Sequence, residues 1–132
     1  MTRQNVPSGS PLEPVIGFSR AVRVGNHVSV AGTGPIAPGG RVAGKGDVAA
    51  QLRRCFEISL AALAEAGASA EDVVRTRIML TDISKWEEAA RVHGEVFSAI
   101  RPVNTFVEVS AFVNPDWLVE TEIDAIIGGA PA

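Results

Sequence analysis

An amide, an aromatic ring and a carboxylate stand at alternate positions of the segment after Pro102, as Asn104, Phe106 and Glu108. Alternate side chains of a strand point to the same side, so these three groups share one face if the segment is extended. An amide both donates and accepts hydrogen bonds, which packing against a core does not require. The pattern predicts one wall of a ligand pocket, formed by Asn104 and Phe106.

Carboxylates recur near the end of the chain, where Glu120, Glu122 and Asp124 project from one side of the strand predicted over residues 118–127. Like charges in a row repel one another, so such a face is normally solvated or ion-paired. One of these carboxylates could instead handle protons if it borders a pocket. Neither histidine stands at a spacing typical of metal ligands, and no metal site is expected.

Two guanidinium groups, Arg75 and Arg77, share a face of the strand predicted over residues 73–80. Exposed faces usually carry such charges, so we favour a solvated face or ion pairs between subunits. The alternative is an anion site, because arginine offers a rigid fork that matches a carboxylate. Arg77 is kept as a candidate substrate-binding residue on this second interpretation.

His93 falls on the inward stripe of the helix predicted over residues 84–100, where a lone histidine usually serves packing. Its ordinary pKa also suits acid–base chemistry if the ring borders a cleft. Gly32, followed by Thr33 and a second glycine, ends an earlier strand. These glycines allow a ligand to approach the backbone closely, or mark a bulge. His93, Gly32 and Thr33 are therefore candidate ligand contacts.

The elements that must position these groups follow from periodicity and from turn and cap residues. Both predicted helices carry one apolar stripe, so an α+β fold with both helices on one face of a mixed sheet is expected. The other face needs covering, which favours a homo-oligomer with ligand clefts between subunits. The predicted segments are an irregular lead-in over residues 1–14, a single domain over 15–129, a hairpin turning at Gly25-Asn26, a helix between Asp47 and Gly67, a strand over 73–80, a helix opened by a capping box at Ser84, a strand from Asn104 and a final strand over 118–127.

Composition excludes several classes of function. The net charge is −3 and aromatic residues make up 5%, which argues against a dedicated nucleic-acid surface. No apolar run approaches the length of a membrane span. The single cysteine, Cys55, rules out an intrachain disulfide, and we expect a cytoplasmic protein with Cys55 in its core. A soluble, unexported protein is the expectation.

The chain resembles the Rid family, also called YjgF or L-PSP, over almost its whole length. The matching segments are 22–32, 49–51, 71–74, Pro102, 107–109 and 122–125. The resemblance implies a chorismate-mutase-like fold, a homotrimer and small-molecule clefts at the subunit interfaces. Members of the RidA type hydrolyse reactive enamines and imines, such as 2-aminoacrylate, to a 2-keto acid and ammonia without a cofactor.

The chain departs from the family at one position. Members of the RidA type carry a substrate-binding arginine in a Pro-Ala-Arg-Ser pattern, and Asn104 takes its place here. Losing a charge-assisted fork costs about 1.5–3 kcal/mol of hydrogen bonding to a carboxylate. The family's catalytic glutamate matches Glu122. The resemblance thus implies an enamine or imine deaminase that acts on a substrate other than 2-aminoacrylate. The alternatives are a non-catalytic metabolite-binding or regulatory trimer and, third, an endoribonuclease.

Overall fold

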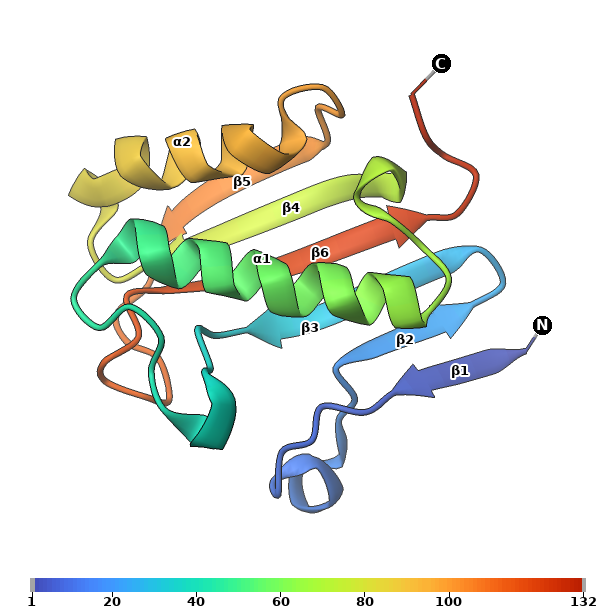
Figure 1. Ribbon diagram of the computed structural model, residues 1–132, viewed down its shortest axis with the longest axis horizontal. Coiled ribbons are helices and arrows are strands. Elements are labelled where there is room, and N and C mark those ends of the chain that lie inside the picture. Colours follow the sequence, from blue (N-terminus) through green and yellow to red (C-terminus); the bar gives the residue numbers. More distant parts are fainter. Residues whose placement is uncertain (1, 132) are drawn as a thin grey trace.

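Alternating buried and exposed residues in the later strands assemble into one six-stranded sheet, and two amphipathic helices cover one of its faces (Figure 1). The computed structural model describes residues 2–131. The main elements, in chain order, are β1 (Arg3–Val6), β2 (Ala21–Val24), β3 (His27–Thr33), α1 (Val48–Glu65), β4 (Val73–Leu80), α2 (Trp86–Phe97), β5 (Val103–Glu108) and β6 (Val119–Ile126). The expected α+β class is confirmed.

The strand order across the sheet is β1-β2-β3-β6-β4-β5. Within residues 2–131, β4 and β5 are the one pair of parallel strands, and α2 connects them because a parallel pair needs a long crossover. The last strand, β6, lies between β3 and β4 and is antiparallel to both. The hairpin of β2 and β3 turns at Gly25-Asn26, where Gly25 adopts a φ of 60°.

Helix α1 begins and ends at the residues that the sequence indicates. The carboxylate of Asp47 accepts a hydrogen bond from the Ala50 amide at 3.1 Å and caps the first turn. Gly67, with a φ of 88°, follows the helix in a left-handed conformation that favours glycine. Cys55 lies on the buried stripe with no exposed surface, and burial raises the pKa of its thiol.

Helix α2 begins differently from the prediction. The expected capping box at Ser84 is wrong, because Asp82 accepts hydrogen bonds from both the amide and the hydroxyl of Ser84. A short helical turn over Ile83–Lys85 therefore precedes α2. The helix ends at Phe97, three residues before the expected end at Ile100.

The N-terminal segment also differs from the expected irregular lead-in over residues 1–14. Residues Arg3–Val6 form β1 and pair antiparallel with β2, and Glu13–Gly17 form a single π-helical turn. Prolines and glycine in this segment predict an irregular structure that buries little surface, but Val6 packs into the core with 2% of its surface exposed. Pairing with β2 gives the backbone N–H and C=O groups of β1 the hydrogen-bond partners that the segment does not supply by itself.

The core lies between the sheet and the two helices, and one buried amide ties a long loop to it. Gln51 has no exposed surface; its side-chain amide donates to the Asp116 carbonyl at 3.1 Å and accepts from the Leu118 amide at 2.7 Å. These two bonds fix the segment that leads into β6. No helix among residues 2–131 combines the length and apolarity needed to span a membrane.

Replacing Gln51 with leucine should lower the free energy of unfolding by about 2–4 kcal/mol, because two buried backbone groups lose their partners. The matched control is Gln4→Leu, which removes a side-chain bond to the Glu65 carbonyl at an exposed site and should cost less than about 1 kcal/mol. Urea denaturation followed by circular dichroism, at one protein concentration, measures both. Equal losses would contradict the role assigned to Gln51.

Candidate functional site

Arg77 and Glu122 form an ion pair in the middle of the sheet face that carries no helix. They stand opposite each other in β4 and β6, and Nη1 of Arg77 donates a hydrogen bond to Oε1 of Glu122. The Arg77 side chain is 45% exposed and that of Glu122 is 43% exposed. A guanidinium and a carboxylate are thus exposed side by side and are accessible to a molecule that binds to this face.

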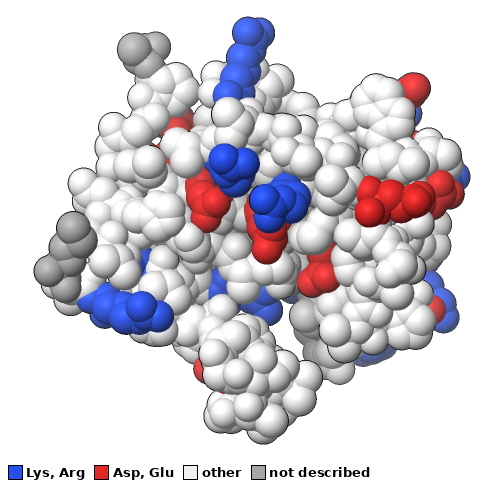
Figure 2. All heavy atoms as spheres, turned by 180° about the vertical axis from the view of Figure 1, so that it is seen from behind, with Lys and Arg blue, Asp and Glu red and all other residues white. Residues whose placement is uncertain are grey.

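A second ion pair extends this charged patch along the same strands. Arg75 lies 4.0 Å from the Asp124 carboxylate, which also accepts a hydrogen bond from the Ser29 hydroxyl at 2.9 Å. The ring of His27 bonds to the same hydroxyl at 2.9 Å. Figure 2 views this face and shows blue and red side chains adjoining near its centre, surrounded by mostly uncharged surface. Both arginines are half-exposed, as expected for a solvated face, but their partners are carboxylates of the same protomer, whereas the sequence pattern favoured ion pairs between subunits.

Asn104 faces the opposite side of the sheet, toward α2. Its amide donates to the hydroxyl of Thr76 at 3.0 Å, and that hydroxyl is 2.8 Å from Nε2 of His93. Thr76 has no exposed surface. The hydroxyl therefore links the edge strand β5 to helix α2 through two side-chain hydrogen bonds.

His93 packs in an aromatic cluster at this edge. Its ring centroid lies 4.8 Å from that of Phe97, 6.0 Å from that of Phe56 and 6.4 Å from that of Phe106. Burial lowers the pKa of the imidazole, which stays neutral near pH 7. These contacts support the packing role for His93, and Phe106 shares it.

The predicted site residues therefore divide between two faces of one sheet. Thr76 pairs with Asn104, and its neighbour Arg77 pairs with Glu122, so the two predicted residues must point to opposite faces. One protomer does not bring Asn104 and Glu122 into a common pocket. The sequence shows the alternation within each strand, but it does not show which set of side chains faces the helices. For this reason the sequence alone assigns Asn104 and Glu122 to the same site.

Gly32 and Thr33 lie near a different pair of charged groups. A Cβ on Gly32 would stand 3.5 Å from Oε1 of Glu120, which is an ordinary contact distance, so Gly32 lies beside that carboxylate without glycine being required there. Thr33 is fully buried and its hydroxyl donates to the Ala31 carbonyl at 2.8 Å. Nη1 of Arg20 donates to the same hydroxyl at 3.1 Å. The role found for Thr33 is structural.

Arg20 is a buried cation that the sequence reasoning missed. Its position just before β2 follows no periodic pattern, and its burial depends on the loops that close over it. Burial raises the pKa of Glu120, while Arg20 opposes that rise. The two groups lie close enough to influence each other without forming an ion pair within 4.0 Å among the described residues.

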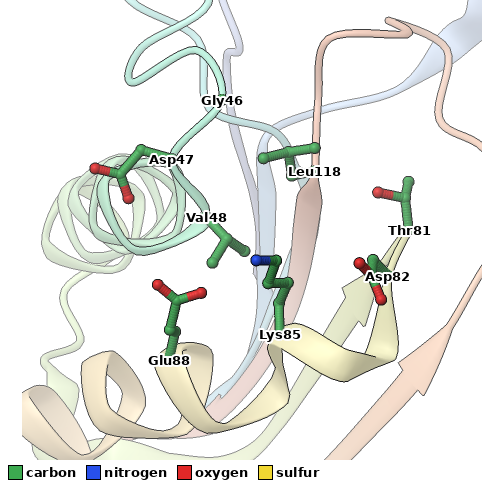
Figure 3. A pocket seen from close by; sticks show the side chains of 8 residues that line it. All are labelled: Gly46, Asp47, Val48, Thr81, Asp82, Lys85, Glu88 and Leu118. Carbon is green, nitrogen blue, oxygen red and sulfur yellow. The ribbon is translucent and has the colours of Figure 1, made fainter.

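A cavity of about 420 Å³ opens between the N-terminal ends of α1 and α2 (Figure 3). Lys85 extends into it between Asp47, Asp82 and Glu88, so both signs of charge line its wall. None of the predicted site residues lines this cavity. Residues 2–131 contain no group of three or more acidic, histidine or cysteine side chains placed to hold a metal ion.

Residues 9–127 match the family described as endoribonuclease L-PSP. The chain belongs to this family. The match confirms the resemblance to the Rid, YjgF or L-PSP proteins that the sequence motifs indicated. Trimers are typical of its members.

Relatives of this family cover nearly the whole chain. A crystal structure of a Mycobacterium tuberculosis member of the YjgF/YER057c/UK114 family has a TM-score of 0.85 and 47% identity, covering 95% of this chain and 99% of the other. An uncharacterised protein of Streptomyces coelicolor is 38% identical over 125 residues, which are 95% of this chain and 92% of that protein. The protein named 3-aminoacrylate deaminase RutC from Acinetobacter baylyi is 34% identical over 115 residues, or 87% and 90% of the two chains.

The lowered pKa of His93 predicts a pH dependence of stability. The pKa of His93 is lower in the folded protein than in the unfolded chain, where it is about 6.5, so the unfolded chain binds a proton more readily. The free energy of unfolding therefore falls as the pH drops from about 6.5 toward the pKa of the folded protein. The slope from one group is at most about 1.4 kcal/mol per pH unit. His93→Gln should reduce the difference in unfolding free energy between pH 7.5 and pH 5.5.

His27→Gln is the matched control, because it makes the same substitution at an exposed site on the opposite face, outside the aromatic cluster. Denaturant titrations at several pH values measure all three proteins. If wild type and His93→Gln gave parallel curves, the neutral, packed state of His93 would be contradicted.

Proposed function

We propose that this protein is a deaminase that hydrolyses the C=N bond of a small imine, or of an enamine after its tautomerisation, and releases ammonia. The observation that carries the proposal is the half-exposed Arg77–Glu122 pair on the sheet face without helices. Glu122 stands at the position of the family's catalytic glutamate. A relative 34% identical to this chain is named 3-aminoacrylate deaminase, which supports the same class of reaction.

The site is completed by a second copy of the chain. Apolar side chains remain exposed around the charged patch, among them Val103 at 58%, Ile126 at 45% and Val107 at 36%. Covering them removes apolar surface from water, which favours association through this face. We infer a homotrimer, the assembly typical of the family, in which a neighbouring copy closes a cleft over Glu122.

Glu122 acts as general base and then as general acid. Arg77 orients the carboxylate of Glu122 through its hydrogen bond, and the carboxylate accepts a proton from a water molecule while the water oxygen attacks the imine carbon. That proton passes from Glu122 to the nitrogen and gives a carbinolamine. Glu122 then takes the proton of the carbinolamine hydroxyl and delivers it to the amino nitrogen, so that the C=O bond forms as the C–N bond breaks and ammonia leaves. Water is the only co-reactant, so the reaction needs no cofactor or metal.

Asn104 sets the substrate apart from that of RidA-type members. Its amide already donates to Thr76, and an amide lacks the two parallel donors with which an arginine holds a carboxylate. Asn104 and Phe106 can meet Glu122 only through a neighbouring copy, since one protomer places them on opposite faces. We propose a substrate other than 2-aminoacrylate, and 3-aminoacrylate is the first compound to test because of the named relative.

Glu122→Gln should reduce ammonia release from 3-aminoacrylate, generated in situ, to the spontaneous rate, a loss of about 100-fold or more. Asp124→Asn changes a carboxylate on the same face and should keep most of the activity. The wild type should hydrolyse 2-aminoacrylate, generated by a serine dehydratase, near its spontaneous rate. An active Glu122→Gln enzyme would overturn the proposed mechanism, and fast turnover of 2-aminoacrylate would overturn the proposed substrate preference.

Light scattering of the wild type should give three times the chain mass of 13.8 kDa. Val103→Glu places a charge among the exposed apolar groups of the open face and should shift the protein toward monomers, with a matching loss of activity. Val113→Glu is the control, since Val113 is 93% exposed in a loop outside the sheet. A wild-type monomer that is fully active would exclude a site shared between copies.

A further inference from the structure

Arg20 is a buried guanidinium with no carboxylate partner. Only 9% of its surface is exposed, and Nη1 bonds to the Gly32 carbonyl at 3.0 Å and to the Thr33 hydroxyl at 3.1 Å. Among residues 2–131, no acceptor bonds to its Nε or Nη2 and no carboxylate oxygen lies within 4.0 Å. Glu120 and Glu13 act on this charge only from beyond ion-pair distance, so an anion bound directly to the guanidinium would stabilise it further.

The nearest acidic residue of the N-terminal segment is already engaged. Oε1 of Glu13 accepts hydrogen bonds from the amide of Ser8 at 2.6 Å and from its hydroxyl at 2.8 Å. Glu120, on the other side, is half-buried and does not reach ion-pair distance. Nε and Nη2 of Arg20 remain without an acceptor among the described residues, and their adjacent N–H groups form one edge of the guanidinium, which matches two oxygens of a planar or tetrahedral anion.

Arg20 lines a cavity of about 630 Å³, within the range of sites that hold small metabolites. The cavity lies between the loop around Ser8–Pro11 and the turn Pro38–Gly40, which leave the sheet on the same side in Figure 1. Arg20 is the only charged residue among those that line it. The rest of the wall includes Trp117 and Ile36, so a cation faces a largely neutral, partly aromatic space.

Trp117 is held firmly in this wall. A Cβ on Gly34 would stand 2.6 Å from the indole ring, so only glycine allows the ring to pack against that backbone. The ring is also tied to the core through Gln51, which bonds to the backbone on either side of it. A rigid aromatic surface beside a buried cation suits a flat ligand that carries one anionic group.

We propose that this cavity binds a small anion with an apolar, planar body, whose carboxylate or phosphate pairs with Nε and Nη2 of Arg20. The site is separate from the Arg77–Glu122 pair, since neither residue lines the cavity. It gives the protein a second ligand site beyond the proposed deaminase function. Carboxylates and phosphates share the required chemistry, and the experiment compares the two.

Fluorescence of the Trp86→Phe protein tests the proposal, because Trp117 is then the only tryptophan of the chain. Benzoate and phenyl phosphate are the probes, and benzamide is their neutral counterpart. We expect saturable quenching by at least one anion and none by benzamide over the same range. Whichever anion binds more tightly identifies the preferred group. No saturable response to either anion would overturn the proposal.

Arg20→Gln in the same background should weaken anion binding by about tenfold or more, the effect of losing a charge-assisted hydrogen bond. Arg41→Gln removes an exposed charge beside the turn Pro38–Gly40 and is the matched control, which should bind normally. Ala37→Phe fills the cavity and leaves Arg20 unchanged, so it should also abolish binding if Arg20→Gln fails to fold. Glu122→Gln should bind like the parent. Unchanged affinity in Ala37→Phe, or in folded Arg20→Gln, would place the ligand elsewhere.

Discussion

The insertion of β6 between β3 and β4 is the constraint on which the rest of the structure depends. Its hydrogen bonds to both neighbours fix which side chains of three adjacent strands face the helices and which face away. Ile123 enters the core while Glu122 and Asp124 face outward, because a shift of one residue would exchange the two sets. The core and the charged patch are thus specified by one register, and neither can change without the other.

Much of this arrangement could be predicted from local patterns. The Gly25-Asn26 hairpin, the Asp47 cap, the helix stripe containing Cys55 and the strand with two arginines depend on neighbouring residues, and the structure confirms them. The errors arose where distant segments decide. β1 forms because β2 offers a free edge with which it can pair. Asp82 caps the turn before α2 because its carboxylate accepts the hydrogen bond of the Ser84 hydroxyl. Burial of Arg20 depends on loops that no periodicity places.

The candidate site shows the same division. Alternation correctly grouped Arg77 with Arg75, and Glu122 with Asp124, but the face that each group occupies is a property of the assembled sheet. Asn104 looked like a pocket residue because amides rarely serve packing, yet its amide is used to hold Thr76 at the sheet edge. The presence of an amide side chain therefore indicates a polar interaction, but it does not show whether the amide binds a ligand or another group of the protein.

The place of β6 in the chain also affects how the protein is made. Because β6 follows both of its neighbours in the chain, β3 and β4 cannot complete their pairing until the segment up to residue 126 has left the ribosome. During that interval both strands present unpaired edges with apolar side chains, which are sites for association between nascent chains. Deleting the residues of β6 would leave both edges unpaired.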